Sequence, residues 1–156
     1  MSSAFVSFLS ESGIPVRFDE PMASHTTYGV GGPADFFIEP RDEAELAAAV
    51  RTARKHGLPL HFLGGGTNLL VRDEGVRGAV VSLSCLQRRD GAHVQAGCKL
   101  AGLVTATIGE GLAGLEVLAG IPGTVGGAVS MNAGGRHGEM GAAVQYVDVL
   151  GHDGGT

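Results

Sequence analysis

The sequence has few charged residues, few cysteines and no long apolar run. Charged residues make up 17% of its 156 residues, the net charge is −5 and the pI is about 5.6. This balance gives no basic surface for a nucleic-acid backbone, so we expect no nucleic-acid partner. The two cysteines, Cys85 and Cys98, form no CxxC motif and are typical of free thiols in a reducing compartment.

Metal ligands and membrane segments are also absent from the pattern. The six histidines are scattered, and none shares a helix face with a carboxylate at metal-ligand spacing, so we predict no metal site. The amino terminus has no cationic region before its short apolar stretch, and no stretch approaches membrane-spanning length. We therefore expect a soluble cytoplasmic protein with no membrane partner.

Glycine is what the sequence has in excess. The 27 glycines amount to about one residue in six, against an average nearer one in fourteen. The hydrophobic fraction of 44% and the absence of a G-X-Y period exclude disordered and collagen-like chains. At this length one domain or two small lobes are expected. We interpret the glycines as main chain that must come close to something.

The hydrophobic pattern predicts a small α/β unit in the first half. A short amphipathic helix starts at the amino-terminal serines and stops at Gly13, and residues 14–28 look irregular. The strongest helix spans residues 42–56, with acidic residues in its first turn and cationic residues in its last. Strands are predicted at residues 35–39, 60–63, 69–71 and 78–83.

The pattern restarts in the second half. We predict a strand at 92–97, a helix from Leu100 to near Gly109 or Gly111, and a strand at 146–150. The turn at 151–155 has no returning strand, so we expect the chain to stop inside a hairpin. The resulting α+β organisation is a lead-in at 1–19, a first lobe at 20–84 and a second, incomplete lobe at 85–156.

The first candidate motif follows the buried strand that ends at Leu63. Its successive glycines allow main-chain N–H groups to point into one concavity, and two side-chain donors follow. The residues are Gly64, Gly65, Gly66, Thr67 and Asn68. This chemistry suits a pyrophosphate, although a tight strand-to-strand turn is the simpler interpretation. The GxGxxG spacing is excluded by Leu69, and the lysine of a P-loop is missing.

The second candidate motif is a nearly uncharged glycine-rich stretch. Its glycines recur every three residues and would leave one side of a turn or short helix bare for a flat ligand, with later main-chain amides as donors. The residues are Gly120, Pro122, Gly123, Thr124, Gly126, Gly127, Asn132, Ala133 and Gly134. Close packing between elements is the alternative, but Pro122 disfavours a regular packed helix.

A third, weaker motif completes the set: Thr26-Thr27 followed by Gly31-Gly32-Pro33-Ala34, a turn that leads into a strand. Along the chain the third motif comes first, then the first and then the second. In that order the three motifs resemble the UDP-N-acetylenolpyruvoylglucosamine reductase family, over about residues 20 to 150. That family belongs to the flavoproteins with a two-lobed FAD-binding domain of the p-cresol methylhydroxylase type.

The resemblance implies that FAD lies between the lobes. The residues from Leu63 to Asn68 would hold the pyrophosphate, and the second motif would line the rest of the cofactor. Some relatives bind flavin covalently through a histidine in the first loop. This sequence has Thr67-Asn68 there, so a non-covalent FAD is implied. Arg136 and His137 depart from the family's usual pattern, and we assign them no role.

The resemblance also implies an activity for the full-length enzyme. NADPH reduces the flavin, which passes hydride to the enolpyruvyl group of a nucleotide sugar, and a serine then protonates the product. This reaction makes UDP-N-acetylmuramate for peptidoglycan, and so serves the cell wall, cell shape and cell division. The catalytic groups lie in later segments of the family, including a carboxy-terminal substrate domain. We therefore expect an FAD-binding part, truncated before that domain, with no catalytic residue and no turnover of its own.

Three alternatives stay open at this point. The chain could be a stand-alone flavin-binding or electron-transfer module, another oxidase of the same superfamily, or a glycine-rich α/β domain without a nucleotide. A stand-alone module should close its last hairpin, and a covalent oxidase should have histidine in the first glycine loop.

Overall fold

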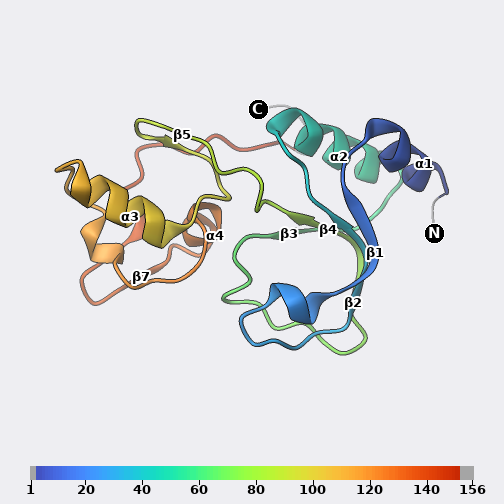
Figure 1. Cartoon of the computed structure of the whole chain (residues 1–156), viewed down its shortest axis with the longest axis horizontal. Coiled ribbons are helices and arrows are strands. Elements are labelled where there is room, and N and C mark those ends of the chain that lie inside the picture. The colour runs from blue at the N-terminus through green and yellow to red at the C-terminus, as the bar shows by residue number, and fades with distance from the viewer. Residues whose placement is uncertain (1–2, 152–156) are drawn as a thin grey trace.

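The computed structural model describes residues 3–151. Figure 1 shows two groups of elements side by side: we call the group of α1, α2 and β1–β4 (residues 3–82) the first lobe, and the group from β5 onward (from residue 89) the second lobe. The expected α+β organisation is confirmed. The turn predicted at 151–155 extends beyond the described residues. None of the helices within 3–151 is long and apolar enough to cross a membrane.

The first lobe is built on a four-stranded sheet. Its strands are β1 (Val16–Pro21), β2 (Pro33–Ile38), β3 (Leu60–Leu63) and β4 (Val76–Ser82), in the order β1-β2-β4-β3. β1 runs antiparallel to β2, whereas β2 and β3 both run parallel to β4. The carboxyl ends of β2, β4 and β3 therefore meet at one edge of the sheet.

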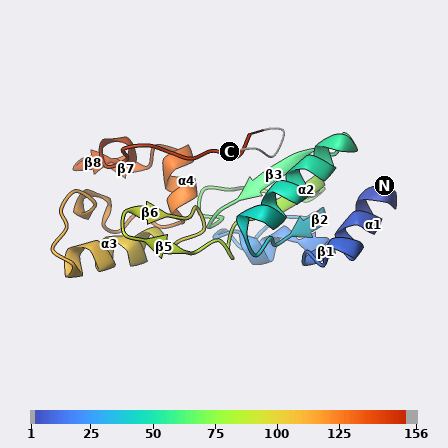
Figure 2. The ribbon, with the colours of Figure 1, turned by 90° about the horizontal axis from the view of Figure 1, so that it is seen from above.

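Two helices cover one face of this sheet, α1 (Ser3–Ser12) and α2 (Glu43–Lys55) (Figures 1 and 2). The Phe5 ring from α1 packs edge-on against Phe36 of β2, with ring centroids 5.4 Å apart. Leu9 and Ile14 join the same buried cluster. The amino-terminal helix thus shares the core of the first lobe.

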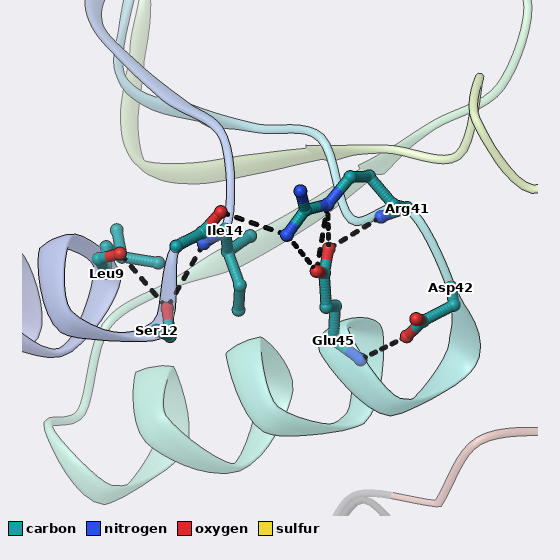
Figure 3. A network of polar contacts seen from close by, with 7 residues as sticks. Leu9, Ser12, Ile14, Arg41, Asp42 and Glu45 are labelled. Carbon is teal, nitrogen blue, oxygen red and sulfur yellow. Dashed lines mark hydrogen bonds and ion pairs between the residues drawn. The ribbon is translucent and has the colours of Figure 1, made fainter.

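Polar contacts join the end of α1 to the segment that precedes α2 (Figure 3). Asp42 caps α2 by accepting a hydrogen bond of 2.8 Å from the Glu45 amide. The Arg41 guanidinium pairs with the Glu45 carboxylate and donates to the Gly13 carbonyl at 3.1 Å. One arginine therefore connects the end of α1 to the start of α2.

The opposite face of the sheet is covered by loops. Phe37, Leu63 and Val80 form a second core with Met22, from the short 3-10 helix η1 (Met22–His25), and with Val71. The loops that carry Met22 and Val71 therefore lie over this face and approach the carboxyl edge.

The second lobe has little regular structure. Its elements are β5 (Arg89–Asp90), β6 (His93–Val94), α3 (Leu100–Gly109), η2 (Glu116–Leu118), α4 (Val125–Ser130), β7 (Gly134–Gly135), β8 (Gly138–Glu139) and η3 (Met140–Ala142). β5-β6 and β7-β8 are separate two-stranded hairpins. Leu100, Leu118 and Met140 lie at the centre of its aliphatic core.

The long helices and three strands agree with the sequence prediction, but four predictions were wrong. Residues 14–28 are not irregular, because they contain β1 and η1. Residues 69–71 form no strand: Val71 is buried as part of a loop while Leu70 is exposed. The strand predicted at 92–97 is reduced to β6. Residues 146–150 run extended without pairing to any strand in the described chain.

Candidate functional site

The three glycine motifs, distant in sequence, meet between the lobes. The amide of Thr27 donates to the carbonyl of Gly66 at 3.0 Å. A Cβ atom on Gly65 would lie 2.9 Å from the Cα atom of Gly123, and one on Gly64 would lie 2.5 Å from Thr124 Oγ1. The loop of the first motif therefore lies between the other two.

The main-chain amides of this loop are its most distinctive feature. Among the residues at 3–151, none accepts a hydrogen bond from the amides of residues 64–68, although Gly66 is buried. Buried N–H groups are normally paired, so the Gly66 amide needs an acceptor from elsewhere, whereas the amides of Gly65 and Asn68 belong to exposed residues and are open to solvent or a ligand. A row of such donors in a turn is a common anion-binding arrangement.

The glycines of the loop are needed mainly because of their protein neighbours. Gly66 has φ +64°, and a Cβ on it would overlap the carbonyl oxygen of His25. With the close approaches at Gly64 and Gly65, this leaves no room for a side chain at any of the three positions. The sequence pattern associates these glycines only with N–H groups that point into one concavity; the structure shows that they also allow three loops to pack together.

A cavity of about 300 Å³ opens beside this loop, at the carboxyl edge of the sheet. Leu63, Gly64 and Gly65, which belong to the first motif and the strand before it, line this cavity. Its other lining residues were not among the predicted cofactor contacts: Ser24, His25, Thr26, Thr27, Glu39, Ser82 and Ser84. The sequence did carry a signal for part of this set, because Glu39 and Ser82 stand at the ends of two predicted strands. In open sheets ligands bind outside the carboxyl ends of parallel strands.

Polar contacts fix the side chains at one side of the cavity. The His25 ring stacks on Phe37 with centroids 4.1 Å apart, and its Nε2 atom lies 2.8 Å from a Glu20 carboxylate oxygen. Glu39 forms an ion pair of 3.0 Å with Arg17. The segment that donates to Gly66 is thus held on the sheet.

The second motif does not have the single bare face that its spacing predicted. Gly120 and Gly123 lie in a loop with φ values of +84° and +117°, whereas Gly126 is inside α4. A Cβ on Gly126 would lie 2.6 Å from Ala96. The short helix α4 begins three residues after Pro122. Thr124 caps it by accepting a hydrogen bond from the Gly127 amide at 3.4 Å.

The prediction that residues 132–134 offer free amides was wrong for the first two. The amides of Asn132 and Ala133 donate to the carbonyls of Val129 and Ala128. The Asn132 side chain also accepts from the Gly141 amide at 2.9 Å. These contacts hold the β7-β8 hairpin, so the segment has little to donate to a ligand through its amides.

Titratable groups away from the loop have local explanations. Burial raises the pKa of the Cys98 thiol, and the main-chain amides of Glu116 itself and Gly114 lower the pKa of the Glu116 carboxyl. Within residues 3–151, no group of three or more histidine, cysteine or acidic side chains could hold a metal ion.

Comparison with known proteins agrees with this geometry. The FAD binding domain family matches residues 34–156. The UDP-N-acetylenolpyruvoylglucosamine reductase of Heliobacterium modesticaldum is 46% identical over 140 residues, which cover 86% of this chain and 45% of that enzyme. The crystal structure of UDP-N-acetylenolpyruvylglucosamine reductase from Thermus caldophilus superposes with a TM-score of 0.69 at 41% identity, covering 83% of this chain and 46% of that one.

A more distant match shows the fold alone. A solvent-stable cholesterol oxidase superposes with a TM-score of 0.61 at 19% identity, over 80% of this chain and 25% of its own. The chain spans about half the length of the reductases that it matches. The match to the FAD binding domain family excludes the alternative of a glycine-rich domain without a nucleotide.

Proposed function

The chain belongs to the FAD binding domain family, and from this membership we propose that it holds FAD for an NADPH-dependent UDP-N-acetylenolpyruvoylglucosamine reductase. The full enzyme converts UDP-N-acetylglucosamine enolpyruvate, a nucleotide sugar, to UDP-N-acetylmuramate for peptidoglycan. It thereby supports the cell wall, cell shape and cell division from the cytoplasm. Identities of 46% and 41% to two such reductases, against 19% to the oxidase, favour this reaction.

The free amides of residues 64–68 carry the proposal. They hold the FAD pyrophosphate, because a row of N–H donors complements the negative charge of its two phosphates. Leu63 and the second motif line the rest of the cofactor. The contact between Gly65 and Gly123 supports this arrangement, because it brings both motifs to one site.

FAD, when bound, supplies hydride transfer, and this chain's residues bind and orient it. The loop of the first motif contains Thr67 and Asn68 and no histidine, so the attachment is non-covalent. No residue of this chain is assigned the role of catalytic acid. The proton donor and the substrate-binding groups belong to the part of the enzyme that follows the FAD-binding lobes.

The direct test is a titration of the 156-residue chain with FAD, followed by flavin absorbance and fluorescence. We expect saturable binding and complete release of the flavin on acid precipitation. Absence of binding at excess FAD would refute the proposed function, and flavin retained in the acid precipitate would refute the non-covalent attachment.

A substitution in the loop sharpens this test. Gly65→Val should weaken FAD binding about tenfold, because its Cβ would displace Gly123 by close contact at 2.9 Å. Gly102→Ala is the matched control: it lies in α3, and its Cβ would meet no atom within 4 Å. An unchanged affinity in a folded Gly65→Val protein would contradict the role of the loop.

A further inference from the structure

Three residues stand at the carboxyl edge of the sheet, and two of them, Glu39 and Ser82, are not used by the proposed pyrophosphate contacts. Glu39 directly follows β2, Ser82 ends β4, and Gly64 directly follows β3. Side chains alternate along a strand, so Glu39 lies on the same face as Phe37, and Ser82 on the same face as Val80. Phe37 and Val80 belong to the core beneath the loops, and all three edge residues line the cavity.

The hydroxyl groups of Ser82 and Ser84 leave one hydrogen-bond donor at the cavity. Ser82 is 3% exposed, and its hydroxyl donates to Ser84 Oγ at 3.0 Å. The Ser84 amide in turn donates to Ser82 Oγ at 3.3 Å. Ser84 lines the cavity with its own hydroxyl hydrogen uncommitted within the described chain.

The polar residues that line the cavity indicate which kind of chemical group can bind there. Glu39 contributes a carboxylate whose side chain is 26% exposed, and no lysine or arginine of residues 3–151 lines the cavity. Arg17 pairs with the Glu39 carboxylate at 3.0 Å and offsets part of its charge, so Glu39 contributes acceptor oxygens to the cavity rather than an uncompensated charge. These oxygens and the Ser84 hydroxyl suit a neutral group with several hydrogen-bond donors.

We propose that Glu39, Ser82 and Ser84 bind vicinal hydroxyls of a sugar that adjoins the pyrophosphate of FAD. The inference rests on the proposed function, because Gly64 and Gly65 belong both to the free-amide loop and to the cavity wall. In FAD the pyrophosphate is flanked by the ribityl chain on one side and the adenosine ribose on the other, so a hydroxyl-bearing carbon chain adjoins the loop in either direction. Acidic side chains on sugar hydroxyls are a general feature of dinucleotide sites.

The test compares two variants that break the same ion pair. Glu39→Gln removes the carboxylate charge, whereas Arg17→Met keeps the carboxylate and removes its partner at 3.0 Å, together with the Arg17–Glu20 ion pair and the contact of Arg17 with the Phe37 ring. We expect Glu39→Gln to weaken FAD binding about tenfold and Ser84→Ala several-fold, because charged and neutral hydrogen bonds differ in strength. Arg17→Met should bind FAD within about twofold of the unmodified chain.

Two fragments of the cofactor identify which sugar is bound. FMN contains the ribityl chain without adenosine, and ADP contains the adenosine ribose without the ribityl chain. If Glu39→Gln weakens ADP binding and leaves FMN binding unchanged, the sugar is the ribose. The reverse result identifies the ribityl chain.

The outcomes separate this inference from the proposed function. If the unmodified chain fails to bind FAD, the proposed function is wrong. If it binds FAD and both Glu39→Gln and Ser84→Ala bind equally well, only the sugar site is wrong. The sugar site is also refuted if Arg17→Met loses as much affinity as Glu39→Gln, or if neither FMN nor ADP responds to Glu39→Gln. Thermal unfolding of each variant confirms that the compared proteins are folded.

Discussion

The two lobes are stabilised in different ways. The first contains all six phenylalanines of the sequence and a four-stranded sheet with apolar cores on both faces. The second has an aliphatic core, no strand longer than two residues in the described chain, and most of the glycines. The first lobe is held by strand pairing and aromatic packing, whereas the second depends on its aliphatic core, on the Thr124 cap of α4 and on close main-chain contacts.

This difference makes the second lobe depend on the first. Gly97 packs against the main chain that leaves β4, because a Cβ on it would overlap the carbonyl oxygen of Leu83. Gly65 receives Gly123, and Gly64 receives Thr124. The free-amide loop therefore has two tasks, since it offers donors to a ligand and also seats the second lobe.

The largest expected effect comes from removing a core side chain in each lobe. Phe36→Ala should cost about 4 kcal/mol and Leu118→Ala about 3 kcal/mol of unfolding free energy, because both side chains are about 1% exposed. Hydrogen exchange should show that Phe36→Ala also exposes α3 amides in the second lobe. Leu118→Ala should leave the β2 and β4 amides protected.

The direction of this asymmetry is what matters. Loss of β2 and β4 protection in Leu118→Ala would mean that the first lobe needs the second, contrary to the packing of Phe5 on Phe36 within the first lobe itself. Denaturant unfolding of both variants gives the accompanying free energies.

Helix caps give a matched comparison of intermediate size. Asp42 caps the 13-residue α2 from the surface, and Thr124 caps the six-residue α4 from a buried position. We expect Asp42→Ala to cost about 1 kcal/mol and Thr124→Ala about 2 kcal/mol, because the latter also leaves a gap beside Gly64. Urea unfolding measures both. A larger loss for Asp42→Ala would contradict the greater dependence of the second lobe on single caps.

The sequence predicted the fold best where periodicity and burial agree. The helix at 42–56 has an apolar stripe and cap residues, and α2 forms there. β1 was missed because it is a largely exposed edge strand whose polar residues give no alternation, and Asp19 interrupts it with φ +50°. Residues 146–150 do alternate, but alternation specifies a strand only when a partner strand is present, and none pairs with them in the described chain.

For the site, the sequence indicated the loops but not their contacts. The free amides of 64–68 follow from a glycine run after a strand, a local property. The partners of Asn132 and the approach of Gly65 to Gly123 depend on tertiary packing, which spacing alone does not encode. Glu39 was missed although it ends a predicted strand, because that signal indicates a site only once the strands are known to run parallel; Ser84, beyond the end of β4, had no such signal.

The smallest expected effect comes from one exposed ion pair in each lobe. Arg41 lowers the pKa of Glu45 in the first lobe, and Arg89 lowers that of Glu110 in the second, in both cases chiefly through side-chain hydrogen bonds. A carboxyl whose pKa is lowered by folding stabilises the protein fully above its ordinary pKa of about 4.5, and this contribution is lost as the pH falls through the folded-state value. Thermal unfolding at pH 7 should therefore separate Glu45→Gln and Glu110→Gln from the unmodified chain more than unfolding at pH 3.

The two variants should still differ, because the contacts of the carboxylates differ. Glu45 also accepts a hydrogen bond from the Arg41 amide at 2.8 Å, and the Arg41 guanidinium donates to the Gly13 carbonyl. Loss of the Glu45 carboxylate therefore loosens the connection between the end of α1 and the start of α2. Within residues 3–151 the Glu110 carboxylate pairs with Arg89, and its side chain is 48% exposed, so salt screens the pair readily. We expect the larger decrease in melting temperature for Glu45→Gln, and 1 M salt should remove most of the decrease for Glu110→Gln. Equal decreases that persist in salt would show that the second lobe relies on the Arg89–Glu110 pair as much as the first lobe relies on the Arg41–Glu45 pair.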